Sequence, residues 1–248
     1  MSAEWIVGIN PVEAVLTEGA ARVRELWLQR DANNPRLAAL AELARRQDIA
    51  VELRPRAALE RIAGGARHQG IAAQCVAAPL SDERSLPDLL AQAGRDALLL
   101  VLDGVTDPHN LGACLRSAAA AKVTAVIVPK DRAVGLTPVV RRASAGGADR
   151  VPLIAVTNLA RTLRELKDAG VWITGLAGDT DTVLYGVDFK GPVALVLGGE
   201  GEGMRRLTRE LCDFVVKIPM PGTMESLNVS VAAGIVLFEA LRQRSKSR

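Results

Sequence analysis

Three short stretches of the sequence carry polar side chains of the types that bind ligands or do chemistry. The first holds Asn110 and Arg116, separated by five residues, the second holds Glu200, and the third holds Ser226 and Asn228. Amide, guanidinium, carboxylate and hydroxyl groups gathered in one place are what a binding or catalytic site consists of. These side chains can form one site only if the fold brings the three stretches together.

Each stretch also has a purely structural explanation. In the first, Asn110 is predicted to cap a helix that carries Arg116 on its surface. In the second, residues 198–203 fit a tight turn between a strand and a helix. In the third, Ser226 and Asn228 are typical helix N-caps, whose side-chain oxygens accept hydrogen bonds from free backbone N–H groups. Two such residues around a single leucine are more than one cap requires, which favours a further role.

Residues 1–77 are predicted to form a small α/β unit. Four strand-like runs alternate with three helical ones, an order that favours a sheet flanked by helices. Asn10 is predicted as the N-cap of the first helix, with Pro11 at the first helical position. The strand-like runs are "WIVGI", "VRELWLQ", "IAVELRP" and "IAAQCVA", and the helical ones are "PVEAVLTEG", "PRLAALAELARRQ" and "ALERIAG".

The composition changes at residues 78–96, where two prolines and a cluster of Ser, Asp, Glu and Arg predict a linker with one short helix. In residues 97–248, six apolar runs alternate with helical patterns. The runs lack the period-2 alternation of half-buried strands, so they predict a parallel sheet buried on both faces. They are "ALLLVLDGV", "TAVIVP", "VPLIAV", "VWITGLA", "PVALVLGG" and "FVVKIP". The predicted fold class is therefore α/β, with a Rossmann-like parallel sheet.

The order of the runs predicts where the polar stretches lie. The stretch around Asn110 follows the first apolar run of this domain, the stretch around Glu200 follows the fifth, and the third stretch follows the sixth. Ligands of such a sheet bind beyond the carboxyl ends of its strands. All three stretches are therefore expected at one edge of the sheet, where their side chains would converge on one site.

Several common α/β chemistries are excluded. The glycines around Glu200 do not match GxGxxG, and no Asp or Glu lies at residues 217–222 to bind a ribose. Neither a GxxxxGK[ST] phosphate loop nor a GxSxG nucleophile elbow is present. Cys75, Cys114 and Cys212 are far apart and only two histidines occur, so we expect neither a disulfide frame nor a metal site.

The net charge of +3 is mildly basic. A nucleic-acid partner would need basic residues gathered locally, and they gather between Lys130 and Arg150 and in the tail from Arg242 to Arg248. The sequence contains neither an N-terminal signal segment nor an apolar run of about 18 residues, the length of a membrane span. A cytoplasmic protein without a membrane partner is expected.

In this order, the three stretches resemble the motifs of the SPOUT-class (TrmH-like) RNA ribose 2′-O-methyltransferases. The resemblance rests on the N-x5-R pattern of Asn110 and Arg116, on "LGGEGEGM" around Glu200 and on "IPMPGTMESLNVSVAAG". It covers the whole chain, because "RHQGIAA" is similar to the substrate-binding domain, related in fold to a ribosomal L30 protein, that precedes the catalytic domain in some members. Met224 stands where relatives often have valine.

The resemblance implies a deep trefoil knot in the C-terminal segment, the cofactor S-adenosyl-L-methionine and a homodimer built through the C-terminal domain. Residues 1–77 become the RNA substrate-binding domain and residues 97–248 the methyltransferase domain. The implied catalytic residues are Asn110, Arg116, Glu200, Ser226 and Asn228. The implied cofactor-binding residues are Gly198, Gly199, Ile218, Met220 and Leu227.

Methyl transfer needs a ribose oxygen aligned with the sulfonium methyl group and partly relieved of its proton. Two roles are open for Arg116. It either accepts the proton of the 2′-hydroxyl, or it binds an RNA phosphate and stabilises the developing oxyanion. A guanidinium with a pKa above about 12 is a poor base, which favours the second role.

Among family members, "LDGVTDPHNLGACLRSA" and "TNLARTL" are most similar to those that methylate a guanosine of 23S rRNA in the P loop of the peptidyl-transferase centre. The implied partner is 23S rRNA or a precursor of the large ribosomal subunit. The predicted RNA-binding residues are Arg67, His68, Arg141 and Arg142. Two alternatives remain, namely 2′-O-methylation of another rRNA or tRNA nucleotide, and a non-enzymatic RNA-binding protein of ribosome assembly. The intact second and third stretches favour an enzyme.

Overall fold

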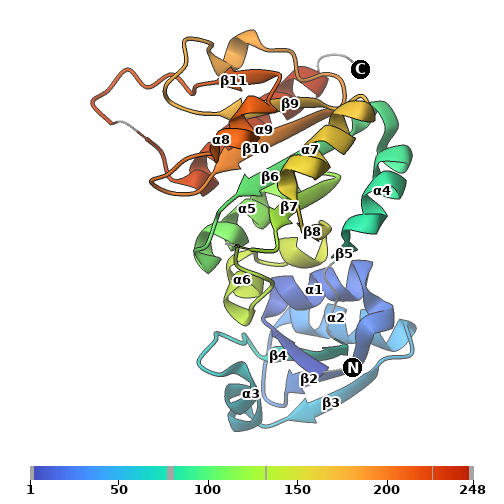
Figure 1. The fold of residues 1–248 in the computed structure, drawn as a ribbon. Coiled ribbons are helices and arrows are strands. Elements are labelled where there is room, and N and C mark those ends of the chain that lie inside the picture. The colour runs from blue at the N-terminus through green and yellow to red at the C-terminus, as the bar shows by residue number, and fades with distance from the viewer. Residues whose placement is uncertain (1–2, 77–80, 132, 225, 246–248) are drawn as a thin grey trace.

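The computed structural model describes residues 3–76, 81–131, 133–224 and 226–245. Its strands form two separate sheets, one from the N-terminal third of the chain and one from the rest. Figure 1 shows the two units end to end, with helix α1 (Ile9–Glu18) of the N-terminal unit facing the C-terminal one. Within these described ranges, no helix has the length and apolar character needed to cross a membrane.

The N-terminal unit confirms the predicted alternation of strands and helices. Its sheet has the order β1-β4-β2-β3, in which β2 and β3 are parallel and β4 is antiparallel to both β1 and β2. Apolar side chains of α1 and α2 pack on this sheet and bury Leu16, Leu26 and Ile71 completely. The elements are β1 (Ala3–Val7), α1, β2 (Val23–Gln29), α2 (Pro35–Arg46), β3 (Ala50–Arg54), α3 (Arg56–Ala63) and β4 (Ile71–Val76).

One predicted detail of this unit is wrong. Helix α1 begins at Ile9, and its N-cap is Gly8 with φ 98°, a left-handed conformation that favours glycine. Asn10 therefore lies inside the first turn, where its Oδ1 accepts a hydrogen bond from Arg36 at 3.1 Å.

The C-terminal unit is a parallel sheet of seven strands in the order β11-β9-β10-β6-β7-β8-β5. Six of these strands are the predicted ones. The seventh, β5 (Ser81–Asp82), comes from the predicted linker and pairs with β8. The other strands are β6 (Leu98–Asp103), β7 (Ala125–Pro129), β8 (Leu153–Val156), β9 (Trp172–Leu176), β10 (Val193–Gly198) and β11 (Phe214–Val216). The helices are α4 (Leu86–Ala93), α5 (Pro108–Ala120), α6 (Pro138–Ala143), α7 (Leu159–Asp168), α8 (Arg206–Glu210) and α9 (Val229–Ser245).

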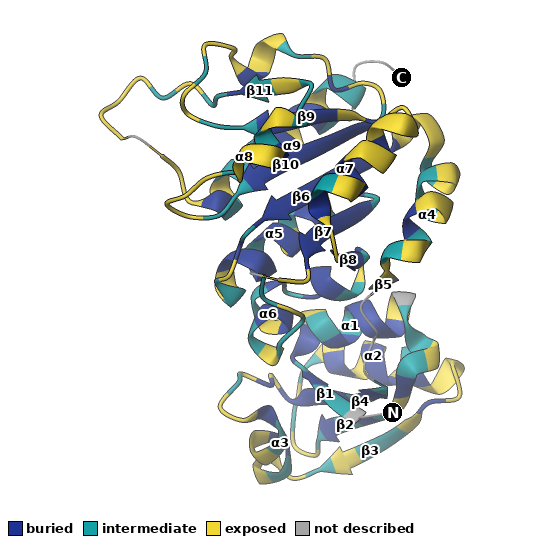
Figure 2. Ribbon diagram, in the orientation of Figure 1, coloured by how far each residue is buried: buried dark blue, intermediate teal, exposed yellow. Residues whose placement is uncertain are grey.

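Both faces of this sheet are covered, as the apolar runs predict. Alternate residues of β6 enter different cores, with Leu100 packing among residues of α5 and α9 and Val101 packing among residues of α7. Figure 2 shows the central strands dark blue, with most exposed residues on the outer surfaces of the helices and in the loops; Trp172 and Phe214, the first residues of β9 and β11, are exposed as well. Burial on both faces explains why the strands read as continuous apolar runs.

The sheet changes direction at β6. From β6 the chain continues through β7 and β8 on one side, whereas β10, β9 and β11 lie on the other. Gly198, the last residue of β10, pairs with Asp103, the last residue of β6. The carboxyl ends of these two strands are therefore neighbours at the switch point of the sheet, the usual position of a ligand site in open α/β folds.

The C-terminal helix α9 is fastened by Arg244. Its guanidinium donates hydrogen bonds to the backbone oxygens of Phe189, Asp96, Ala97 and Gly191, at 2.6–3.0 Å. Burial lowers the pKa of this guanidinium. Arg244, one of the basic residues that gather in the tail, therefore uses its donors inside the protein.

The neighbouring basic residues of the tail divide into two groups. Arg242 pairs with Glu239 at 2.7 Å. Lys246 and Arg248, the other basic residues of the predicted cluster, lie outside the described residues.

Candidate active site

The switch point brings the first and second polar stretches together. Helix α5 begins five residues after the end of β6, and the Glu200 loop follows β10 directly. Gly199 N donates to Asp103 O at 2.9 Å, which joins the two loops through the backbone. A Cβ atom built on Gly199 would lie 2.4 Å from Gly104 O, so this close approach requires glycine.

The first stretch is capped differently from the prediction. Asp107, not Asn110, is the N-cap of α5, and its carboxylate accepts hydrogen bonds from His109 N at 3.2 Å and Asn110 N at 3.1 Å. Pro108 occupies the first helical position, where a missing N–H costs nothing. Because Asp107 serves the helix end, the amide of Asn110 is available for other contacts.

The amide of Asn110 joins a polar cluster with Glu200 and Asn228. Asn110 Nδ2 donates to Glu200 Oε1 at 2.5 Å. Asn228 Nδ2 donates to Asn110 Oδ1 at 3.0 Å and to Glu200 Oε1 at 3.2 Å. One residue from each predicted stretch is thus held in a closed triangle, and the predicted convergence of the stretches is confirmed.

Asn228 has a second task in the third stretch. Its Oδ1 accepts from Ser230 N at 2.9 Å and from Ser230 Oγ at 2.6 Å, so it also caps the start of α9. Ser226 is exposed and lies apart from the triangle, although it lines the cavity beside it. The two cap-type residues therefore differ, because Asn228 combines capping with the triangle and Ser226 faces the cavity.

Arg116 lies on the exposed face of α5 and forms no ion pair with any described residue. Its backbone is tightly packed, since a Cβ atom on Gly147 would come within 2.8 Å of Arg116 Cα. The guanidinium is therefore carried by a fixed backbone and remains available to an anion from solution.

A cavity of about 710 Å³ opens beside the triangle. Its lining combines backbone of the 198–203 loop with apolar side chains, and it includes all five predicted cofactor-binding residues. They are Gly198, Gly199, Ile218, Met220 and Leu227. The size lies in the usual range for small-molecule sites, which is about 300–1,000 Å³. Apolar walls and backbone polar groups in one cavity suit a ligand with an aromatic base and polar substituents, so the residues present fit S-adenosylmethionine.

Asp103 and Arg205 form an ion pair that holds the 198–203 loop near the end of β6. The sequence did not predict a role for either residue. Asp103 is 1% exposed. Its carboxylate accepts from Arg205 Nε at 2.6 Å and from Arg205 N at 3.0 Å. An acidic residue at the end of a fully apolar strand is the signal in the sequence that could have identified it, because a buried carboxylate needs a partner.

The four predicted RNA-binding residues occupy different environments. Arg67 and Arg142 are exposed, and Arg67 borders a cavity of about 430 Å³ in the N-terminal unit. His68 borders the same cavity but is 9% exposed, and its Nδ1 accepts from Gly70 N at 3.0 Å. For Arg141 the prediction is wrong, because it is buried and its guanidinium pairs with Asp149 at 2.7 Å.

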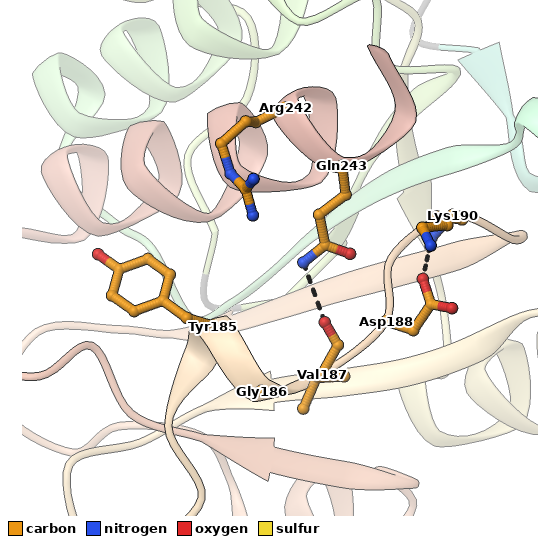
Figure 3. Close-up of a pocket in the computed structure, with 7 residues that line it drawn as sticks. All are labelled: Tyr185, Gly186, Val187, Asp188, Lys190, Arg242 and Gln243. Atoms are coloured by element: carbon orange, nitrogen blue, oxygen red, sulfur yellow. Dashed lines mark hydrogen bonds between the residues drawn. The ribbon is translucent and has the colours of Figure 1, made fainter. Parts of the chain in front are cut away.

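A further cavity, of about 420 Å³, lies away from these residues, where the end of α9 meets the segment before β10. Figure 3 shows Gln243 donating to Val187 O and the backbone N–H of Lys190 donating to the Asp188 carboxylate. None of the predicted site residues lines this cavity. In the part of the chain that the structure describes, no group of three His, Cys, Asp or Glu side chains could hold a metal ion.

Both parts of the chain match models of known protein families. Residues 97–238 match the model of the SpoU rRNA Methylase family, and residues 5–80 match the model for RNA 2'-O ribose methyltransferase substrate binding. The chain is 59% identical to the 23S rRNA (guanosine-2'-O-)-methyltransferase RlmB of Xylella fastidiosa, over 98% of this chain and 97% of that protein.

Solved structures are also similar over nearly the whole chain. A crystal structure of an RNA 2'-O ribose methyltransferase has a TM-score of 0.79 at 28% identity, covering 98% of this chain and 89% of that one. The SpoU methyltransferase AviRb from Streptomyces viridochromogenes, in complex with AdoMet, has a TM-score of 0.78 at 25% identity, covering 98% and 91%. The match of the family model to more than half of the chain, together with these relatives, shows that this chain belongs to the SpoU rRNA methylase family.

Proposed function

We propose that this protein transfers a methyl group from S-adenosylmethionine to the ribose 2′-hydroxyl of a guanosine in 23S rRNA, within the P loop of the peptidyl-transferase centre. The observation that carries the proposal is the triangle of Asn110, Glu200 and Asn228 beside a cavity of about 710 Å³. The printed activity of the relative at 59% identity supports the substrate. The similarity to that relative spans both units of the chain. This supports an rRNA as substrate over a smaller RNA that the C-terminal unit would bind alone.

When bound in the cavity, S-adenosylmethionine supplies an electrophilic methyl group. The residues of this chain orient the acceptor. Glu200 Oε1 receives N–H groups from both asparagines, which fixes the carboxylate. Its other oxygen has no hydrogen-bond partner among the described residues and can accept a hydrogen bond from a ribose hydroxyl. Ser226, exposed at the cavity edge, offers a further hydroxyl to the acceptor nucleotide.

Arg116 acts on the RNA rather than on the protein. Its exposed guanidinium suits a bidentate contact with an RNA phosphate. From that position it holds the ribose in place and stabilises negative charge as the 2′-oxygen loses its proton to the bound phosphate or to solvent water. We therefore assign Arg116 an electrostatic role in place of proton acceptor.

The segment that closes the cavity also supports a trefoil knot. After β11, at one edge of the sheet, Ile218, Met220 and then Ser226 to Asn228 line the cavity beside β10, and α9 then packs with α5 in the core. Knots are otherwise nearly absent from proteins. From the resemblance in sequence, we also propose that the N-terminal domain, residues 1–77, is related in fold to a ribosomal L30 protein. A crystallographic trace without the threading, or with another N-terminal topology, would contradict these assignments.

The protein is proposed to act as a cytoplasmic homodimer. Val231 and Phe238 on α9 are each 50% exposed, and a spacing of seven residues places them on one face of the helix. Exposed apolar patches of this kind mark interfaces. Light scattering should give twice the mass of one chain, and Phe238→Glu should reduce that mass to one chain. A wild-type monomer at micromolar concentration would contradict the dimer.

Leu227→Asp should weaken S-adenosylmethionine binding by about a hundredfold, because a carboxylate placed against the apolar part of the cofactor costs a few kcal/mol. Calorimetry in the presence of a chelator measures the affinity and tests at the same time whether binding needs a metal. Leu207→Asp is the matched control, since Leu207 on α8 is 42% exposed, close to the 38% of Leu227, and does not line the cavity. Equal affinities of the two variants would contradict the placement of the cofactor.

The substrate is tested by transfer of a labelled methyl group from S-adenosylmethionine to purified RNAs. Unmethylated 23S rRNA should accept one methyl group at a guanosine ribose, and tRNA should accept none. Transfer to tRNA, or to another rRNA nucleotide, would replace the proposed substrate. Binding of RNA without any transfer would favour the non-enzymatic alternative.

A further inference from the structure

The two units are joined by a ring of four charged side chains. Within the N-terminal unit, Arg22 pairs with Glu4 at 3.1 Å, and within the C-terminal unit, Arg141 pairs with Asp149 at 2.7 Å. Two further pairs cross the boundary, Arg22 with Asp149 at 3.3 Å and Arg141 with Glu4 at 3.2 Å. Cations and anions therefore alternate around the ring, and each of the four residues takes part in one of these pairs within its own unit and in one across the boundary.

The ring lies largely out of solvent. The side chain of Asp149 is 3% exposed and that of Arg141 is 9% exposed, while Arg22 and Glu4 are about one-quarter exposed. Buried ion pairs of this kind give little net stability, but removing one member leaves an uncompensated charge. Their best-attested use is to select one arrangement of the groups they join.

The segment between Arg141 and Asp149 contacts both the N-terminal unit and the catalytic helix. A Cβ atom on Gly146 would lie 3.0 Å from Asn10 O and 3.0 Å from the Cβ of Ala14, both in α1. A Cβ atom on Gly147 would lie 2.7 Å from Leu115 O and 2.8 Å from Arg116 Cα, in α5. Two consecutive glycines thus place α1 on one side and the backbone of Arg116 on the other.

The turn itself is internally fixed. Ser144 Oγ donates to Arg141 O at 2.8 Å and accepts from Ala148 N at 3.2 Å. Ala145 and Gly146 both have positive φ, at 49° and 94°. The segment 144–149 is therefore a rigid spacer, so a displacement of α1 cannot be absorbed by it without disturbing the ring or the contact with α5.

We propose that Asp149 is a positioning residue, which, through the ring and the 144–149 spacer, fixes the substrate-binding unit at one orientation relative to Arg116. The inference rests on the proposed function, since it assigns the orientation to the alignment of RNA. An RNA held by the N-terminal unit then presents its target ribose at a set position to the guanidinium and to the triangle. The cofactor cavity is not part of this arrangement, because the ring and the spacer do not line it.

The inference predicts separate effects on RNA and on cofactor. Asp149→Asn should lower kcat/KM for RNA by about tenfold to a hundredfold, the usual effect of a small misplacement far from the chemistry. Most of the change should be a higher KM for RNA, because saturating RNA can still draw the two units together. The Kd for S-adenosylmethionine should change by less than about twofold, because the substitution removes no contact with the cofactor.

The orientation is measured directly by pulsed electron spin resonance on the full chain, with spin labels at Ala39→Cys in α2 and Arg164→Cys in α7, both exposed helical positions. Cys75 and Cys114 are buried, and burial raises the pKa of each thiol to about 12, so they stay unlabelled, while Cys212 is replaced by serine. The wild-type distance distribution should be narrow. In Asp149→Asn it should broaden or shift.

Arg22→Gln provides a second route, because it removes the crossing pair from the N-terminal side and serves if Asp149→Asn does not fold. Arg46→Gln is the matched control, since it removes an exposed pair with Glu42 inside α2 of the N-terminal unit, and it should leave both readouts unchanged. A wild-type distance distribution in the ring variants would overturn the inference, whatever the methylation rate. Failure of the wild type to methylate RNA would instead contradict the proposed function, and the distance measurement would still decide the role of the ring.

Discussion

Replacing Arg116 with alanine should reduce methyl transfer to RNA by about 10²- to 10³-fold, the usual effect of removing a donor that stabilises a developing oxyanion. Arg116 is exposed on α5 and lies outside the cavity lining, so the Kd for S-adenosylmethionine should not change. Single-turnover kinetics with saturating cofactor and RNA measure the effect. Arg164→Ala, which removes an exposed arginine from the helical layer on the other face of the sheet, should be close to wild type.

The pH dependence of Arg116→Lys separates the two roles of this residue. If Arg116 positions a phosphate and stabilises charge, lysine retains the charge but loses the planar fork. The variant should then be slower than wild type, faster than alanine, and should keep the wild-type shape of the pH–rate profile. A new titration near the pKa of lysine, with activity recovering at high pH, would show that residue 116 accepts the proton and would contradict the electrostatic role.

Replacing Gly198 with alanine should weaken S-adenosylmethionine binding by about tenfold to a hundredfold, since overpacking costs about 1–3 kcal/mol. The added Cβ would lie 1.9 Å from Gly203 C and 2.1 Å from Met204 N. Both atoms belong to the backbone of the loop that carries Glu200, so the loop itself must move. Calorimetry gives the affinity, and RNA methylation should fall further because Glu200 leaves the triangle.

Gly191→Ala is the control for this effect. Gly191 precedes the other end of the same strand, and a Cβ atom there would meet nothing within 4 Å. It should bind the cofactor as the wild type does. Equal loss in both variants would indicate that alanine destabilises the strand in general, and unchanged binding in Gly198→Ala would contradict the assignment of the 198–203 loop to the cofactor.

Patterns in the sequence were sufficient for the elements that bury apolar surface. The six apolar runs of the C-terminal unit became β6 to β11, because burial on both faces leaves a continuous apolar signature. Strand β5 was missed, because two residues carry no period, and it joins the sheet only through its pairing with β8.

The sequence predicted which residues lie in the site better than it predicted the hydrogen bonds that they form. Asn110 and Asp107 are both cap-type residues three positions apart, and only the fold shows that Asp107 takes the cap while Asn110 turns to Glu200. Arg141 and Arg142 are adjacent in a basic stretch, but helical geometry points one into the interface and the other to solvent. The position of Asp103 at the end of an apolar strand indicates that it needs a partner, but Arg205 is 102 residues away in the chain, so the sequence does not show which residue that partner is.

The proposed target of the protein is one ribose in one RNA. The most direct test is to map 2′-O-methylation across 23S rRNA in cells that have the protein, in cells that lack it, and in cells that carry only the Arg116→Ala variant. We predict that a single methylated guanosine, in the P loop of the peptidyl-transferase centre, is lost without the protein and is not restored by the variant. An unchanged methylation map in cells that lack the protein, or loss of methylation at a tRNA nucleotide instead, would contradict the account.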